Sequence, residues 1–423
     1  MNWLPILIFV VGYVFIVFEH PLRLNKTVPS LLIGVLIWTV IYVGNIPLDE
    51  GDKETLLLHH LGKIAEIVFF LKGAMTIVEL IDLHRGFALV RRLIQTNNKV
   101  KMLWLVAWGA FFLSAMLDNL TTTIVFVSLL RKLIQEREDR LWFISLVVIA
   151  VNAGGAWSPI GDVTTTMLWI GQKISAINLV IHLFLPSVAC LLVPLSVMSF
   201  MPRFREKIIC QTIEEDKESE RLLSSRIMLW VGLGALLFVP IFKAVTHLPP
   251  YIGMLFALAI VWLISEYIHP EEDFSEERRH LYSAQHALSR VDFSSILFFI
   301  GILLAISGLE TLGNLRLFAE ALTAFIGDKS LIAIVLGVAS AVIDNVPLVA
   351  AAMGMYDDAM DSIFWHLIAY TCGTGGSMLI IGSAAGVAAM GLERIDFIWY
   401  LKKISWLAAL GYLAGILVFE MLI

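Results

Sequence analysis

Two Asp-Asn pairs interrupt apolar runs of this chain. The first lies in SAMLDNLTTTIV, residues 114–125, and the second in SAVIDNVPLVAA, residues 340–351. A hard monovalent cation takes oxygen ligands from carboxylates, amide carbonyls, hydroxyls and unwound backbone. Three threonines follow the first pair, whereas VPLVAA follows the second and offers no hydroxyl. These residue types predict an asymmetric cation site whose richer half lies at Asp118.

Both aspartates also admit a structural interpretation. Asp118 or Asp344 would then cap a helix or belong to a buried ion pair, and capping does not exclude a role in function. A charged carboxylate is costly in hydrocarbon, so intramembrane acids usually face a cavity and act in function. The same pair at equivalent positions of two similar segments favours the functional interpretation.

A glycine-rich segment follows each pair. VNAGGAWSPIGDVTTT covers 151–166, and TCGTGGSMLIIGSAAG covers 371–386. Glycine and proline would unwind a helix at membrane depth, where irregular backbone is tolerated only if it is buried in protein or lines a cavity. Tight helix packing through small residues is the alternative. The two segments add side-chain oxygens from Asn152, Ser158, Asp162, Thr164 and Thr165, and from Thr371, Thr374, Ser377 and Ser383.

A third polar element, residues 56–85, precedes the first pair. Helical spacing places His59, Lys63 and Glu66 on one stripe, and Lys72, Thr76 and Glu79 on another. These residues either form a proton path or pH sensor, for which Glu and His are suited, or neutralise one another as local Lys–Glu pairs. The corresponding segment of the second half carries Glu310.

The elements that position these residues are predicted to be membrane helices. Of 423 residues, 59% are hydrophobic and 16% are charged, whereas a soluble domain is about a quarter charged. Many apolar runs reach the roughly 20 residues that a helix needs to cross a bilayer. We expect an all-α polytopic membrane protein with ten full spans, two re-entrant hairpins and broken helices. The expected spans are 2–18, 28–46, 57–82, 141–171, 175–201, 226–245, 250–268, 291–327 (too long for one helix), 362–386 and 396–422.

The chain start and the cysteines add two expectations. Residues 1–20 lack a basic n-region and a small-residue cleavage site, so we expect a retained first span and not a cleaved signal peptide. Cys190, Cys210 and Cys372 have neither the spacing of a disulfide framework nor that of a metal site. We therefore expect no cofactor, and a lipid bilayer rather than a nucleic acid as partner.

The two halves of the chain resemble each other in the order of these elements. We expect a first repeat over 1–202, a cytoplasmic linker over 203–225 and a second repeat over 226–423. Each repeat has a hairpin and a broken helix, at about 102–130 and 141–171 in the first and about 330–356 and 362–386 in the second. Five full spans per repeat would invert the second relative to the first, as in many secondary transporters. The positive-inside rule then places both termini outside.

The motifs 58–82, 114–125, 152–169, 340–351 and 373–386 together resemble the NhaD-type sodium/proton antiporters of the ion transporter superfamily. The resemblance implies exchange of Na⁺ or Li⁺ for H⁺ across a bacterial-type inner membrane, by a homodimer with a scaffold and a mobile transport domain. It implies Na⁺ ligation at Asp118, Asn119, Asp344 and Asn345. By matching position, it also points to His59, Glu66, Ser114, Thr121, Asn152, Asp162, Thr164, Thr165, Ser340 and Ser377.

A competition mechanism follows as a hypothesis. A buried carboxylate favours its neutral form, whereas a bound cation favours the ionised form, so cation and proton would displace one another at Asp118 and Asp344. Related carboxylate transporters carry Ser-Asn-Thr at the hairpin tip, and aspartate in its place disfavours an anionic substrate. Efflux of arsenite, antimonite or another small solute is the alternative function. A channel is a further one, and the motifs HExxH, GxSxG and GxGD of an intramembrane enzyme are absent.

Overall fold

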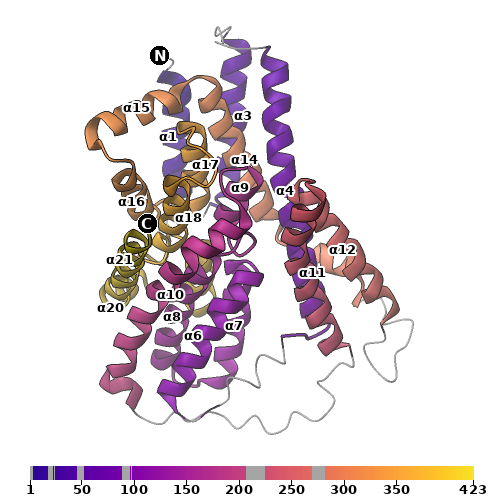
Figure 1. Ribbon diagram of the computed structural model, residues 1–423, viewed down its shortest axis with the longest axis vertical. Coiled ribbons are helices and arrows are strands. Elements are labelled where there is room, and N and C mark those ends of the chain that lie inside the picture. The colour runs from indigo at the N-terminus through magenta and orange to yellow at the C-terminus, as the bar shows by residue number, and fades with distance from the viewer. Residues whose placement is uncertain are drawn as a thin grey trace.

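The computed structural model describes residues 3–17, 22, 24–44, 52–87, 96, 98–205, 224–268 and 282–423. Residues 206–223, most of the expected linker, lie outside this part of the chain, as do residues 269–281. The described residues fold into helices joined by short connections, without a strand among them (Figure 1). The all-helical prediction is confirmed for them.

The helices follow the apolar runs closely. In the first half they are α1 (Trp3–Val17), α3 (Thr27–Val43), α4 (Lys53–Leu83), α6 (Lys99–Met116), α7 (Asn119–Leu133), α8 (Arg137–Ala156), α9 (Val163–Ile170) and α10 (Ala176–Phe200). In the second half they are α11 (Ser225–Thr246), α12 (Pro250–Tyr267), α13 (Ala284–Arg290), α14 (Phe293–Thr311), α15 (Asn314–Ile326), α16 (Lys329–Ala339), α17 (Asn345–Met355), α18 (Ile363–Gly375), α19 (Ala384–Glu393), α20 (Phe397–Lys403) and α21 (Ser405–Leu422). The second broken helix therefore runs past the expected residue 386, to Glu393.

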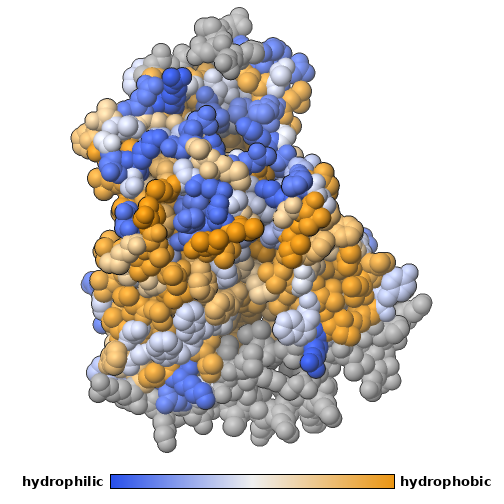
Figure 2. Space-filling view, viewed as in Figure 1, coloured by the Kyte–Doolittle hydropathy of each residue, from blue (hydrophilic) through white to orange (hydrophobic). Residues whose placement is uncertain are grey.

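Seven of the described helices are long and apolar enough to cross a membrane, or eight if the bent pair α15–α16 counts as one span. This is fewer than the ten expected spans, because α1, α3 and α18 are short and α4 carries Lys63, Glu66, Lys72 and Glu79. The seven include α6, which was expected to be part of a hairpin and not a full span. Hydrophobic side chains form a broad band across the visible face, and hydrophilic side chains gather above it (Figure 2). The chain is a multi-span membrane protein.

The helices pack into two groups that meet at the centre of the molecule. We call α1, α3, α4, α11, α12 and α14 the frame group, and α6–α9 with α16–α19 the site group (Figure 1). In the frame group α3 lies along α14, and the Ser30 hydroxyl donates to the Phe298 carbonyl at 2.7 Å. Helices α10 and α21 pack together and against α8 and α18. The frame group contacts the site group where α14 packs on α17 and where α4 packs on α9.

Equivalent backbone contacts hold the two halves of the site group. The Ser114 hydroxyl on α6 donates to the Val151 carbonyl of α8 at 2.7 Å, and the Ser340 hydroxyl after α16 donates to the Cys372 carbonyl of α18 at 2.8 Å. Glycines allow this approach. A Cβ added at Gly161 would lie only 2.6 Å from the Ser114 carbonyl oxygen, and one added at Gly382 only 2.6 Å from the Ala341 carbonyl oxygen. Close packing, the alternative interpretation of the glycines, thus holds at these positions.

Candidate functional site

Four helices of the site group begin at one place, and each begins with a capping side chain. The caps are Asp118 for α7, Asp162 for α9, Asp344 for α17 and Ser383 for α19. They accept from the backbone N–H groups of Thr121 at 2.8 Å, Thr164 at 2.8 Å, Val346 at 3.3 Å and Gly386 at 3.2 Å, respectively. Free N–H groups and the positive end of a helix dipole both favour an ionised carboxylate. Three acids are thereby held at the helix breaks.

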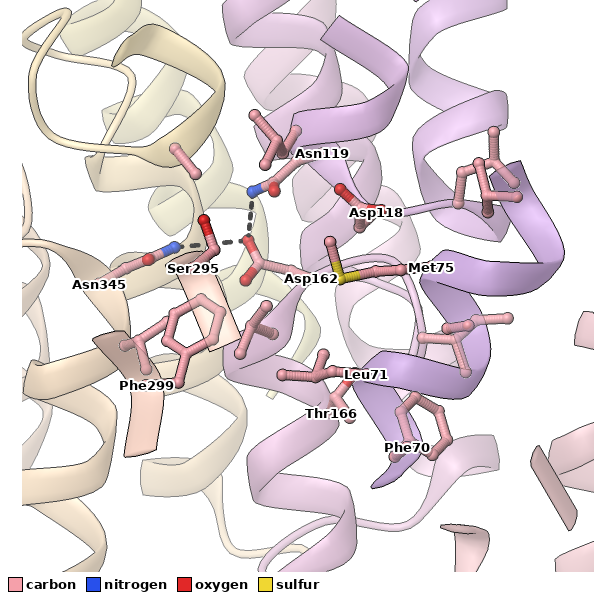
Figure 3. Close-up of a pocket in the computed structure, with 18 of the residues that line it drawn as sticks. Phe70, Leu71, Met75, Asp118, Asn119, Asp162, Thr166, Ser295, Phe299 and Asn345 are labelled. Atoms are coloured by element: carbon pink, nitrogen blue, oxygen red, sulfur yellow. Dashed lines mark hydrogen bonds between the residues drawn. The ribbon is translucent and has the colours of Figure 1, made fainter. Parts of the chain in front are cut away.

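Asp162 lies at the centre of this arrangement. The Asn119 amide donates to Asp162 Oδ2 at 2.9 Å, and the Asn345 amide donates to the same oxygen at 3.4 Å (Figure 3). All three side chains are buried, and that of Asp162 is 2% exposed. The two asparagines come from the two similar segments of the sequence, so the site is built from both halves of the chain.

A chain of hydrogen bonds extends from Asn119 into the second half. Its amide also donates to Asn152 Oδ1 at 3.2 Å, and the Asn152 amide donates to the hydroxyls of Ser377 and Ser383, each at 2.9 Å. The Thr165 hydroxyl donates instead to the Ser158 carbonyl at 2.7 Å, so it shapes the break and leaves the carboxylates to other donors.

Two threonine hydroxyls bond directly to the acids of the first half. Thr121 Oγ1 donates to Asp118 Oδ2 at 2.6 Å, and Thr164 Oγ1 donates to Asp162 Oδ1 at 2.9 Å. The position equivalent to Thr121 in the second half is Pro347, which offers no hydroxyl to Asp344. The expected asymmetry in hydroxyls is therefore present in the geometry.

A partly enclosed cavity of about 70 Å³ lies between these residues and the frame group. Its polar wall carries Asp118, Asn119, Asp162, Asp344 and Asn345, and its apolar wall carries side chains of α4 and α14 such as Met75 and Phe299 (Figure 3). A space of this size holds a few water molecules, or a cation with some of its water. The cavity thus presents oxygens on one side and hydrocarbon on the other.

Three polar residues of the cavity wall were not expected from the sequence, and one of them is Thr166 of α9. Lys26, which directly precedes α3, places Nζ 3.2 Å from Asp344 Oδ2, and Ser295 lines the cavity from α14. A lysine just before an apolar helix usually marks the membrane surface, so its neighbours in sequence do not distinguish it. The partner of Lys26 lies 318 positions away.

Several expected residues lie away from the cavity. Glu79 forms an ion pair with Arg290 at 2.6 Å, so it neutralises charge through a distant arginine and not through a local lysine. Glu310 interacts electrostatically with Lys63 and His59. The residues that the cavity does not include are His59, Glu66, Glu79, Ser114, Thr121, Asn152, Thr164, Thr165, Glu310, Ser340 and Ser377. Four of them nevertheless belong to the hydrogen-bond network: Thr121 and Thr164 bond to its acids, Asn152 bonds to Asn119, and Ser377 bonds to Asn152.

Comparison with known proteins agrees with this site in a membrane transporter. The model of the citrate transporter family, CitMHS, matches residues 13–375. The chain belongs to this family. Sodium/proton antiporter 2 of Arabidopsis thaliana is 47% identical over 423 residues, which cover 98% of each chain. Sodium/proton antiporter 1 of the same plant is 50% identical over 414 residues, or 97% of this chain and 70% of that protein.

Bacterial relatives extend the comparison. The Na⁺/H⁺ antiporter NhaD of Alkalimonas amylolytica is 34% identical over 446 residues, which cover 99% of this chain and 90% of that protein. The resemblance to NhaD-type antiporters is therefore confirmed over nearly the whole chain. The CitMHS family description names an organic anion, whereas these relatives are named for cations, so the chemistry of the site decides between the two substrates.

Proposed function

We propose that this CitMHS family member is a secondary transporter that exchanges Na⁺ or Li⁺ for H⁺. The observation that carries the proposal is the convergence of three aspartates and two asparagines on one partly enclosed cavity between two groups of helices. Carboxylate and amide oxygens are ligands that a hard cation prefers. An alkali cation is therefore the substrate that this wall accommodates.

Competition between the two ions supplies the exchange. A cation is held by an ionised carboxylate, and a proton neutralises the same carboxylate, so Asp162 with Asp118 or Asp344 holds one or the other. Asn119 and Asn345 now turn N–H groups towards Asp162. Rotation of either amide by a half turn presents its carbonyl oxygen to a cation, because the two ends of an amide have nearly the same shape.

The charge of the cavity argues against citrate as the substrate. Asp162 interacts electrostatically with both Asp344 and Asp118. Carboxylates of a substrate placed in the same cavity would repel all three acids, and that repulsion is strong where water is scarce.

Alternating access would expose the cavity to each side in turn. We infer that α6–α7 and α16–α17 are re-entrant hairpins, that the halves form an inverted repeat, and that the site group moves against the frame group. The matching contacts of Ser114 and Ser340 support the repeat. The proposal includes a homodimer in a bacterial-type inner membrane, with both termini outside and the linker, residues 203–225, cytoplasmic.

An ion scan in proteoliposomes tests the function. The purified full chain is reconstituted with a pH-sensitive dye inside, an inward acid gradient is set, and Na⁺, Li⁺, K⁺ or citrate is added outside. We expect Na⁺ or Li⁺ to drive proton movement, and K⁺ and citrate to have no effect. Proton movement with citrate alone, or with none of the four, would overturn the proposal.

A control variant separates the cavity from other intramembrane acids. Glu79→Gln removes an acid that is paired with Arg290 outside the cavity, and Arg290 keeps a second acid, Asp82, at 3.4 Å. This variant should retain exchange.

A further inference from the structure

The pair formed by Lys26 and Asp344 crosses the boundary between the two helix groups. Lys26 is anchored in the frame group, because its neighbour Thr27 donates through Oγ1 to the Ser294 carbonyl of α14 at 3.0 Å. Asp344 caps α17 in the site group. The ammonium and the carboxylate are 23% and 15% exposed, so the ion pair is shielded from most water.

Lys26 is also the one basic residue among the described residues that line the cavity. Its Nζ lies 4.5 Å from the centroid of the Phe298 ring, whose face attracts a cation. Asp118 and Asp162, by contrast, accept from neutral hydroxyl, amide and backbone donors. The cavity thus holds three acids and one built-in cation, and that cation contacts one acid only.

We propose that Lys26 is a tethered cation that competes with the transported cation for Asp344. This inference rests on the proposed function. The Lys26 ammonium and Na⁺ each carry a single positive charge, and Asp344 Oδ2 cannot hold both at full strength. When the site is empty, Lys26 neutralises Asp344, and when Na⁺ arrives, Nζ withdraws towards the Phe298 ring.

The competition has a measurable cost in affinity. If a ligand binds only the open form of a site, its apparent affinity equals its intrinsic affinity multiplied by the fraction of sites that are open. Removal of the tethered ammonium lifts this reduction, so the cation-binding affinity rises. If Lys26 served only to stabilise the fold, its removal would lower the stability and leave the affinity of the folded protein unchanged.

Sodium binding by the purified full chain tests the proposal. Binding is measured at alkaline pH, where protons compete least, by calorimetric titration with NaCl and by the Na⁺-dependent rise in melting temperature. Lys26→Gln is expected to lower the half-saturating Na⁺ concentration about tenfold, as the pair is then absent. Lys243→Gln is the matched control, because Lys243 also lies over an aromatic ring, that of Trp169, and bonds to a carbonyl oxygen. It should leave the Na⁺ affinity unchanged.

The arginine variant gives a second measurement. A guanidinium holds a carboxylate with two parallel hydrogen bonds, so Lys26→Arg should compete better than lysine and weaken Na⁺ binding. A folded Lys26→Gln protein with unchanged or weaker Na⁺ binding overturns the proposal. If Lys26→Gln does not fold, Lys26→Arg decides, and an affinity equal to that of the wild type overturns it. Absence of Na⁺ and Li⁺ binding by the wild type itself would instead overturn the proposed function.

Discussion

The two halves of the site occupy equivalent places in the fold but balance their charge differently. In the first half the helices that follow the breaks are capped by Asp118 and Asp162, and each aspartate is bonded to a threonine hydroxyl. In the second half the corresponding helices are capped by Asp344, which faces Lys26, and by Ser383, which is neutral. One half keeps its acids available through neutral donors, and the other covers its single acid with a cation. The two halves of the site therefore share their geometry but differ in their charge.

The largest effect is expected where the halves meet. Asp162→Asn removes the carboxylate that both asparagines contact, and its amide cannot replace a charge. Loss of one partner of a buried charged contact costs about 3 kcal/mol, so exchange should fall at least about a hundredfold. Asp344→Asn should cost less, because Lys26 already covers that acid. Dye-reported proton movement on Na⁺ addition measures both, and a larger loss for Asp344→Asn would reverse the comparison.

Two glycine-to-alanine substitutions, one in each half, test whether the geometry of the two halves is equivalent. A Cβ at Gly154 would meet the Phe111 carbonyl, and a Cβ at Gly375 would meet the Gly337 carbonyl. Both backbone oxygens are held in helices, so Gly154→Ala and Gly375→Ala should each destabilise the protein by about 2 kcal/mol. The melting temperature of the purified protein measures the loss. Gly234→Ala is the control, because a Cβ there meets no atom. A loss in one half only would show that the repeat is not equivalent.

The hydroxyl of Thr121 tests the chemistry that distinguishes the first half. Thr121→Val removes the donor to Asp118, and a hydrogen bond to a charged group is worth about 2 kcal/mol, so exchange should fall about thirtyfold. Thr122→Val is matched in shape, but the buried hydroxyl of Thr122 makes no hydrogen bond within the described residues. It should leave the exchange rate nearly unchanged. Equal effects of the two variants would argue against a special role for Thr121.

The smallest effect concerns the loop between α17 and α18. Asp361 accepts from the Ser175 backbone N–H at 2.6 Å and from the Asn178 amide at 2.8 Å. Partial burial opposes its ionisation, but these hydrogen bonds outweigh burial and lower the pKa of Asp361. The ionised Asp361 carboxylate therefore stabilises the folded protein above its unfolded pKa of about 4. This stabilisation is lost as the pH falls through the lower pKa of the folded state.

Asp361→Asn should accordingly lower the melting temperature at neutral pH and have a smaller effect in acid. The expected loss at neutral pH is about 1 kcal/mol, since each hydrogen bond adds little and the side chain is partly exposed. Asp357→Asn, in the same loop, is the control, because the Asp357 side chain is fully exposed. A loss for Asp361→Asn that grows as the pH falls would contradict this sign.

Much of this arrangement follows from local sequence, and the rest depends on contacts that local sequence does not contain. Asp-Asn pairs, glycines and apolar runs predict where helices break, because capping and hydropathy act over a few residues. The central place of Asp162 arises from Asn345, 183 positions away, and the cover on Asp344 arises from Lys26. These long-range contacts depend on how the helix groups pack against each other. The stripes of α4 likewise suggested local pairs, whereas Glu79 found Arg290.

The close backbone packing of the site group has a mechanical consequence. Where Gly161 and Gly382 bring main chain against main chain, no side chain is available to flex, so this part of the molecule is stiff. The apolar wall formed by Met75 and Phe299 is the compliant side, because its contacts are non-directional and slide without breaking hydrogen bonds. In the proposed movement of the site group against the frame group, a stiff set of ligands beside a compliant wall would carry the bound ion together with its ligands.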